Sequence, residues 1–321
     1  MEYLLRRVAT SLIVIWGVTL VTFMLLHVTA GDYIPGIDPG ANLRPEDLAR
    51  LRVSLGLDRP LYVQYLTWMW ALLHGDLGRS MLDGIPVMQH VRERLPNTFE
   101  LALAAMLMGL AFAIPLGTLS ALRRGTWVDH VVTVFSVSGF AVPQFWLALM
   151  MIVIFSVSFR SWGLPYLPSA GAANPLAHGD LLDRLDHLVM PATVLGLLYI
   201  SVWSRYMRSS MLSVLSQDYI RTARSKGMSG SRVVYAHAFR NAALPLVTLV
   251  GLELPRLVSG ALVVEVVFNW PGIGNFAFQR ALAYDFTAVL GVTTIVAVLV
   301  VAGNLAADLV YTLLDPRVKL A

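Results

Sequence analysis

Long runs of uncharged, mostly apolar residues organise the chain, and short polar segments separate them. Four runs contain no Asp, Glu, Lys or Arg, and they cover residues 8–31, 101–122, 131–159 and 286–307. A helix needs about 20 apolar residues to cross the hydrocarbon core of a bilayer. The pattern therefore predicts membrane-spanning helices, and small residues four apart, such as Gly117 and Ala121, predict close helix packing.

Two further stretches are weaker candidates. Residues 188–204 are at the short limit, and residues 241 to about 268 are apolar but contain three charged side chains. With these two, we predict six spans. The run 131–159 would extend about 43 Å as a helix, against a core of about 30 Å. We therefore expect Pro143 to break it into an approach helix and a crossing helix.

The segment after the first span contains two predicted helices. One runs from Pro45 to about residue 55, with acidic residues in its first turn and Gly56 as its stop. The other covers residues 61–73, which are uncharged, too short to cross and rich in Tyr and Trp. That composition favours a helix at the outer membrane interface. A helix buried inside a small external domain would show the same pattern.

Composition excludes several protein classes. Hydrophobic residues make up 57% of the chain and charged residues 14%, against about 25% charged in a typical soluble domain. The absence of cysteine excludes disulfides, thiolate metal ligands and cysteine nucleophiles. No basic tract is interleaved with aromatics, so we expect no nucleic-acid binding. The first apolar run exceeds the h-region of a cleaved signal peptide, and we expect it to be retained as a span.

Basic residues are distributed unevenly between the two sides of the predicted spans. One side carries 13 basic and 4 acidic residues, in segments 1–7, 123–130, 205–240 and 315–321. The other carries 10 basic and 13 acidic residues, in segments 30–100, 160–187 and 269–285. Because cytoplasmic loops carry the excess of Lys and Arg, both termini are predicted to be cytoplasmic.

The cytoplasmic segment 205–240 contains a short predicted helix, with Asp218 as a plausible N-cap and Gly227 as its C-terminal stop. Such a short helix is unstable alone and needs something to dock against. Thr222 and Ala223 are small and would let a partner approach closely. A solvated loop is the alternative. The candidate docking residues are Asp218, Tyr219, Arg221, Thr222, Ala223, Arg224, Lys226 and Gly227.

Ionisable residues within spans are functional candidates because burying them in lipid is costly. Glu253 and Arg256 are three apart on one helix face, so they either line a path or form a structural ion pair. Glu265 near the outer end of its span, and Asp308 near the inner end of the last, are expected to reach interfacial water in structural roles. His27 is expected to be a packed residue rather than a metal ligand.

Other chemical motifs are weak. The Gly-x-Gly fragment at 272–274 lacks the strand–helix context of a dinucleotide site, and we expect an outer turn or gate there, formed by Trp270, Pro271, Gly272 and Gly274. The histidines lack metal-site spacing, so we expect no metal and no cofactor bound by this chain. There is no Gly-x-Ser-x-Gly elbow and no phosphate-binding loop. The chain therefore lacks the loop with which P-loop proteins hold ATP.

The segment DYIRTARSKGMSGSRVVYAHAFRNAALP (218–245) resembles the cytoplasmic loop of ABC-importer permeases. Arg221-Thr222-Ala223 take the positions of the Glu-Ala-Ala pattern, Gly227 takes the Gly and Leu244-Pro245 the Leu-Pro. The Glu of that pattern is absent, and Arg-Thr-Ala in its place resembles the dipeptide/oligopeptide/nickel branch. The same branch is resembled, in order, by GLDRPLYVQY (56–65), GDLGRSM (75–81), RLPNTFEL (94–101), FNWPGIGNF (268–276) and DLVYTLLDPRV (308–318). At 31–33 the chain has Gly-Asp-Tyr where the branch commonly has Gly-Asp-Pro.

This resemblance implies an all-α polytopic protein with six spans and the type I ABC importer permease fold, in the bacterial inner membrane. We expect a first span in 1–30, an external segment in 31–96, and a core permease domain in 97–321 with a docking loop at 205–240. The implied partners are a second permease, two ATPase subunits that bind ATP and Mg, and an external solute-binding protein, where we expect selectivity to reside. The alternatives are a transporter or channel acting alone, and an intramembrane enzyme, for which the sequence offers no catalytic constellation.

Overall fold

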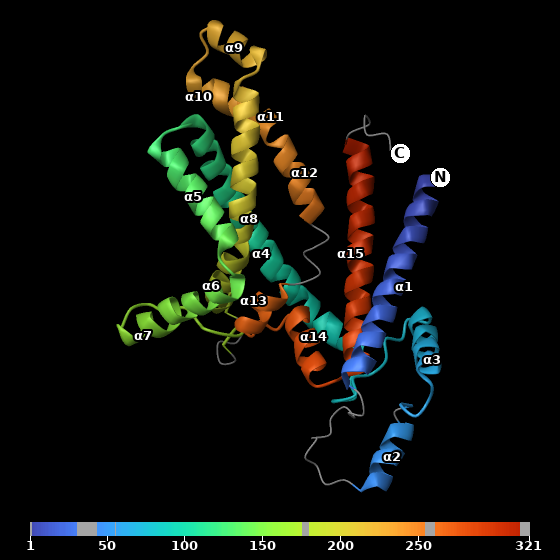
Figure 1. The fold of residues 1–321 in the computed structure, drawn as a ribbon. Coiled ribbons are helices and arrows are strands. Elements are labelled where there is room, and N and C mark those ends of the chain that lie inside the picture. The colour runs from blue at the N-terminus through green and yellow to red at the C-terminus, as the bar shows by residue number, and fades with distance from the viewer. Residues whose placement is uncertain (1, 31–43, 55, 175–179, 254–260, 315–321) are drawn as a thin grey trace. The chain divides into compact units, whose positions relative to one another are not determined.

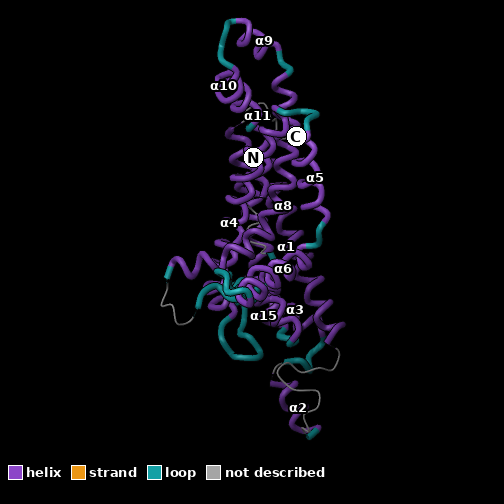
Figure 2. Tube along the Cα trace, turned by 90° about the vertical axis from the view of Figure 1, so that its left-hand side faces the viewer, coloured by secondary structure: helices purple, strands orange, loops and turns teal. Residues whose placement is uncertain are grey.

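In the computed structural model, the described residues are 2–30, 44–54, 56–174, 180–253 and 261–314, and they contain helices and no β-strand (Figures 1 and 2). The all-α prediction is confirmed. The helices are α1 (Glu2–Ala30), α2 (Pro45–Ser54), α3 (Leu61–Leu73), α4 (Val87–Leu122), α5 (Trp127–Ala141), α6 (Gln144–Met151), η1 (Ile152–Ser158), α7 (Phe159–Ser161), α8 (Leu181–Leu215), α9 (Asp218–Ser225), α10 (Gly230–Arg232), η2 (Val233–Phe239), α11 (Arg240–Ala242), α12 (Leu244–Glu253), α13 (Leu262–Val267), α14 (Ile273–Leu282) and α15 (Phe286–Leu314). The labels η1 and η2 denote π-helices.

The chain folds as two compact units. The first unit comprises Met1–Pro96 and Gly272–Ala321, and the second comprises Asn97–Pro271. The division after Pro96 coincides with the end of the predicted external segment. The second division falls inside the predicted core domain 97–321, because α14 and α15 pack with the N-terminal helices.

In the first unit, α1 and α15 lie side by side, and α3 packs on them (Figure 1). Phe23 of α1, Tyr65 of α3 and Leu290 of α15 are buried together, and the Tyr65 hydroxyl lies 3.0 Å from the Thr19 hydroxyl. The bounds predicted for α3 are confirmed. The structure describes α2 over Pro45–Ser54, and the last residue of the predicted helix, residue 55, lies outside the described residues. A positive φ of 68° at Gly56 agrees with its predicted role as a stop.

In the second unit, α4 and α5 pack closely on the long helix α8. A Cβ atom added at Gly117 of α4 would lie 2.5 Å from the carbonyl oxygen of Ser204 in α8. A Cβ added at Gly139 of α5 would lie 2.4 Å from the Ser201 hydroxyl of α8. Small residues thus allow the helices to approach closely, and the close packing predicted from Gly117 is confirmed.

One helix break lies where the sequence predicts it, at Pro143. The helix α5 ends at Ala141 and α6 begins at Gln144, so the predicted break at Pro143 is confirmed. By length and composition, five helices of the described residues could cross a membrane, and a bent pair adds a sixth candidate.

The sixth candidate differs from the predicted fifth span. The structure places it over Gly230–Ala242 and Leu244–Glu253, two helical stretches bent by 40°. A single helix over 241–268 is therefore wrong. Pro245 lacks the backbone N–H that a continuous helix would use, and the break falls just before it.

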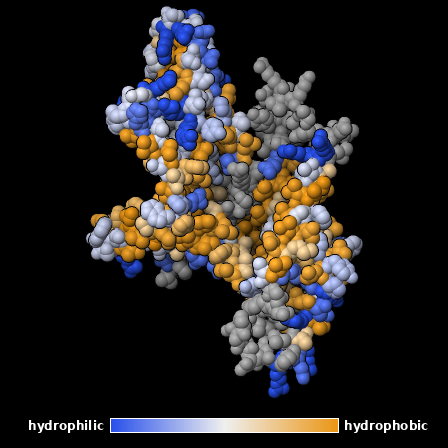
Figure 3. All heavy atoms as spheres, in the orientation of Figure 1, coloured by the Kyte–Doolittle hydropathy of each residue, from blue (hydrophilic) through white to orange (hydrophobic). Residues whose placement is uncertain are grey.

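Apolar side chains cover much of the surface of the helices (Figure 3). Among the exposed ones are Leu12, Ile13, Trp16 and Val21 of α1, and Val134, Phe135, Val137 and Phe140 of α5. A water-soluble monomer rarely exposes so much contiguous apolar surface, whereas a lipid-facing helix requires it.

Candidate functional site

The short helix α9 begins and ends close to where the sequence predicts. Its N-cap is Gln217, with no capping hydrogen bond from its side chain, so the prediction of Asp218 as the N-cap is wrong by one residue. Asp218 occupies the first turn, where a carboxylate favours the helix dipole, and lies 3.5 Å from the Arg221 guanidinium. Gly227 has a φ of 75°, which confirms its role as the stop.

One face of α9 is buried against its own chain. Ile220 and Ala223 are three residues apart and pack with Met207 and Met211 of α8 and Val233 of η2. Ala223 is only 7% exposed. The expectation that Ala223 offers a small surface to a partner is therefore wrong, because its methyl group already faces the core of the second unit.

The other face of α9 is open. Tyr219, Arg221, Thr222, Arg224 and Lys226 are exposed. Hydrophilic side chains cover α9 and α10 in Figure 3, in contrast to the apolar surface elsewhere in this unit. The helix thus presents a basic surface to the solvent.

Two hydrogen bonds tie the segment around α9 to its neighbours. Asn241 Nδ2 donates to the Tyr219 hydroxyl at 2.8 Å, which links α11 to α9. The Ser210 hydroxyl donates to the carbonyl oxygen of Ala242 at 2.8 Å, which links α8 to α11. The exposed helix is therefore held on a folded base rather than on a solvated loop.

An ion pair that the sequence does not predict connects α5 and α8. The Arg208 guanidinium donates to both carboxylate oxygens of Asp129, at 2.7 and 2.8 Å. The Ser120 hydroxyl and the backbone N–H of Gly125 donate to the same carboxylate, at 2.5 and 2.9 Å. Asp129 is buried, so these four bonds compensate for its lost hydration.

At the other end of the second unit, two of the resemblance motifs contact each other. Trp270 is fully buried, and its indole N–H donates to the carbonyl oxygen of Asn97 at 2.9 Å. Asn97 Nδ2 donates to the carbonyl oxygen of Pro271 at 3.0 Å. Arg184 of α8 forms an ion pair with Glu100 and donates to Asn97 Oδ1. Asn97 therefore joins α4, α8 and the segment after α13.

Glu265 of α13 is fully buried and accepts a 2.8 Å hydrogen bond from the Thr98 hydroxyl of α4. The expectation that Glu265 reaches interfacial water is wrong within this chain. The short helix α13 instead directs the Glu265 side chain toward α4. Its place beside Asn97 and Trp270 makes it part of the same polar cluster.

The predicted gate residues do not form one irregular turn. Gly272 is the N-cap of α14, and Gly274 lies within that helix and is buried. The non-helical residues are confined to the short segment that includes Asn269, whose φ of 45° lies in the left-handed region. The prediction that Gly274 belongs to a turn is wrong, because α14 begins earlier than expected.

In the first unit, the segment that contains the resemblance motif GDLGRSM is fastened to α14 and α15. Asp285 is fully buried and lies just before α15. Its carboxylate accepts a hydrogen bond from the Ala288 N–H of α15 at 3.1 Å. The same carboxylate accepts the Ser80 hydroxyl at 2.5 Å and the Met81 N–H at 3.0 Å. Asp285 therefore caps α15 and holds the preceding loop at once.

Asp83 lies in the same segment and forms a 2.5 Å ion pair with Arg280 of α14. Burial works against ionisation of Asp83. Hydrogen bonds from the Ile85 N–H, His90, Ser80 and Arg280 outweigh that effect, and the pKa of the carboxyl is held well below its usual range. Asp83 is therefore a stable anion at physiological pH.

The remaining candidates are only partly described. Glu253 is the last residue of α12, whereas Arg256 and the side chain of Asp308 lie outside the described residues. The predicted Glu253–Arg256 pair stays a prediction. His27 is packed as predicted: one ring nitrogen lies 3.1 Å from Gln64 Oε1, and the ring stacks on Phe286. Among the described residues, no group of three His, Asp or Glu could hold a metal ion.

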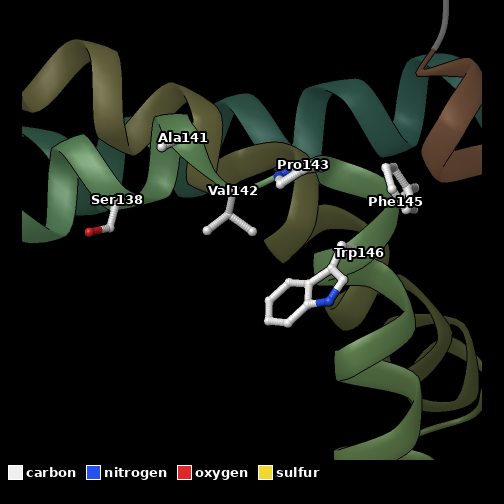
Figure 4. Close-up of a pocket in the computed structure, with 6 residues that line it drawn as sticks. All are labelled: Ser138, Ala141, Val142, Pro143, Phe145 and Trp146. Atoms are coloured by element: carbon white, nitrogen blue, oxygen red, sulfur yellow. The ribbon is translucent and has the colours of Figure 1, made fainter.

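A pocket of about 450 Å³ lies at the break between α5 and α6 (Figure 4). Its lining residues are Ser138, Ala141, Val142, Pro143, Phe145 and Trp146. None of the six ionises, so the pocket offers no charge to the termini of a peptide. It does not change the candidate site, which is the exposed face of α9 on its folded base.

Comparison with known proteins shows the family to which this chain belongs. The sequence profile of the binding-protein-dependent transport system inner membrane component matches residues 113–320. The chain belongs to this family. A profile for the N-terminal part of such components matches residues 1–102. The chain is thus a multi-pass component of the inner membrane that serves transport and is not an enzyme.

Individual relatives of this membrane component extend over its whole length. It is 39% identical over 319 residues to the oligopeptide transport system permease protein AppB of Bacillus subtilis, covering 99% of each chain. It is 37% identical over 340 residues to the dipeptide transport system permease protein DppB of Escherichia coli, again covering 99% of each.

A solved structure shares the fold. The MetNI methionine ABC transporter in an inward-facing conformation matches with a TM-score of 0.54 at 17% identity. The match covers 71% of this chain and 97% of that chain. The predicted importer-permease fold is confirmed.

Proposed function

We propose that this chain is one of two permease subunits of an ATP-driven importer of peptides or similar small solutes. Its partners are a second, similar permease, two ATPase subunits and an external binding protein that delivers the solute. The names of the full-length relatives support the peptide class. The uneven distribution of basic residues supports an orientation with both termini in the cytoplasm.

The observation that carries the proposal is the two-sided character of α9. Its buried face anchors it to the helices of the second unit, and its open face presents Arg221, Thr222 and Arg224. An eight-residue helix held in this way is pre-organised, so a partner that binds it need not pay for its ordering. We assign this face to an ATPase subunit.

The transport cycle in this proposal is alternating access. ATP and Mg bind to the ATPase subunits, whose closure draws the docked α9 helices of the two permeases together. The spans then open toward the binding protein, and hydrolysis resets them. In this proposal the motion of the ATPase subunits acts on α9, and the spans of this chain form part of the path that the solute follows.

The position of α3 supports its placement at the outer membrane interface. Tyr65 faces α1, while Tyr62, Leu66 and Trp70 on the other side of the helix are exposed. A helix inside a small external domain would bury these large side chains. We propose instead that they contact the headgroup region, where Tyr and Trp are enriched.

The test of the docking face is a bulky substitution at an exposed residue. Thr222→Trp should overfill the contact, at a cost of about 1–3 kcal/mol or about five- to 150-fold in association. The measurement is co-purification of the ATPase subunits with the membrane complex, beside solute uptake in reconstituted vesicles. Thr222→Val replaces the hydroxyl with a methyl group of similar volume, and that hydroxyl donates only within α9, to the Asp218 carbonyl oxygen at 3.0 Å, so this variant should bind the ATPase as the parent does.

Two results would contradict the proposal. Full ATPase association and transport in Thr222→Trp would remove α9 as the docking element. Solute uptake by vesicles that hold no ATPase subunit would show a transporter or channel acting alone.

A further inference from the structure

The Asp129–Arg208 ion pair joins three helices of the second unit at one point. Asp129 belongs to the first turn of α5, Ser120 to the last turns of α4, and Arg208 to α8. Arg208 Nε also donates to the Ser120 hydroxyl at 3.1 Å. Both oxygens of the carboxylate are occupied by fixed donors, so the contact has one geometry.

Near the start of α8, a second ion pair between Arg184 and Glu100 holds α8 to α4. The other contacts of α5 with α8 are uncharged, because Asp129 is the only Asp, Glu, Lys or Arg in α5. Gly117 lies against the backbone of α8, and Gly139 lies against the Ser201 side chain of α8. The Ser136 and Ser204 hydroxyls lie 2.8 Å apart between α5 and α8. Gly139 leaves a groove in α5 into which Ser201 and Leu197 of α8 pack, and this contact contains no charged group. The bidentate Asp129–Arg208 pair is therefore the contact best suited to stop α5 from sliding along α8.

The ion pair also lies close to the part of α8 that packs against α9. Met207 and Met211 of α8 flank Arg208 in sequence and are buried in the cluster that holds Ile220 and Ala223 of α9. Arg208 is seven residues, or about 10 Å, from the end of α8 at Leu215. A displacement of α9 thus reaches α8 within about two helical turns of the ion pair.

We propose that Asp129 and Arg208 are positioning residues that make α4, α5 and α8 move as one rigid body when α9 is displaced. This inference rests on the proposed function, in which α9 receives the motion of an ATPase. Without the ion pair, α5 would slip along α8, while the Arg184–Glu100 pair would still hold α8 to α4. ATP would still be hydrolysed, but less of the motion would reach the transport path.

The first test measures rigidity in the parent complex with its partner subunits. The chain contains no cysteine, so Val131→Cys on α5 and Ser209→Cys on α8, both exposed positions, give a clean pair of spin labels. We expect one narrow distance distribution that is the same without nucleotide and with ATP bound. A distribution that shifts between these two states would overturn the proposal outright.

The second test compares solute transported per ATP hydrolysed in vesicles. Asp129→Asn removes the charge, and Arg208→Lys keeps the charge but loses the two parallel hydrogen bonds. Both should lower the ratio by about two- to thirty-fold, the range seen when residues modulate coupling between sites. In Asp129→Asn, the spin-label distances should also broaden or follow the nucleotide.

A double variant separates positioning from mere stability. Exchanging the charges, Asp129→Arg with Arg208→Asp, should restore part of the transport per ATP that Asp129→Arg alone loses. If the single variants lower the yield of assembled complex but leave the ratio unchanged, the pair is only structural and the proposal is overturned. If instead Thr222→Trp retains its ATPase, the docking assignment fails, and the spin-label result then still decides whether α5 and α8 move together.

Discussion

Replacement of Gly117 by alanine tests the close packing of α4 on α8. The added Cβ would lie 2.5 Å from the carbonyl oxygen of Ser204 and 3.1 Å from the backbone nitrogen of Arg208. It would also lie 2.7 Å from Met207 Cβ. Ordinary contacts begin at 3.4 Å, and backbone atoms cannot turn aside as a flexible side chain can. The two helices must therefore move apart.

The expected magnitude combines two opposing effects. Overpacking of a tight contact costs about 1–3 kcal/mol, and the rigid backbone of α8 places Gly117→Ala near the upper value. Alanine recovers about 1 kcal/mol because it favours the helix more than glycine does. We expect a net loss of about 2 kcal/mol, or about 30-fold in the unfolding equilibrium.

The assay is the free energy of unfolding in detergent micelles, from a denaturant titration. Gly17→Ala is the matched control: Gly17 also lies in an apolar helix, but nothing lies within 4 Å of the added Cβ. The control should be neutral or slightly stabilising. Equal free energies of unfolding for the two variants would refute the argument that glycine is required for the α4–α8 approach.

Two further predictions concern α9 and the orientation of the chain. Gly227→Ala places an L residue at a φ of 75° with open space around its Cβ, so backbone strain of about 1 kcal/mol should loosen the end of α9. Faster amide hydrogen exchange in residues 218–226 would report this, and unchanged exchange would contradict it. For orientation, an impermeant thiol reagent should label Asp58→Cys in intact cells but Ser229→Cys only after lysis, both at exposed positions. The reverse pattern would invert the proposed topology.

Local features of this chain could be predicted from the sequence alone. The uncharged runs predict most of the spanning helices, because the thickness of the bilayer sets a minimum apolar length. Pro143 predicts the break between α5 and α6, and Gly227 predicts the end of α9, because both residues act on their own backbone. The bounds of α3 match the uncharged, aromatic-rich stretch 61–73 that the sequence predicts as a helix.

Only the tertiary structure decided which side chains meet. Ala223 turns toward α8 rather than toward a partner, and Glu265 is buried beside Thr98 instead of reaching water. Asp129 and Arg208 are 79 residues apart, and nothing near either one in the sequence marks the pairing. The rotation of each helix about its axis is set by the neighbours that it packs against. The sequence therefore determined where helices begin and end, and the packing of helices distant in the sequence determined which of their residues are buried, paired or free to bind.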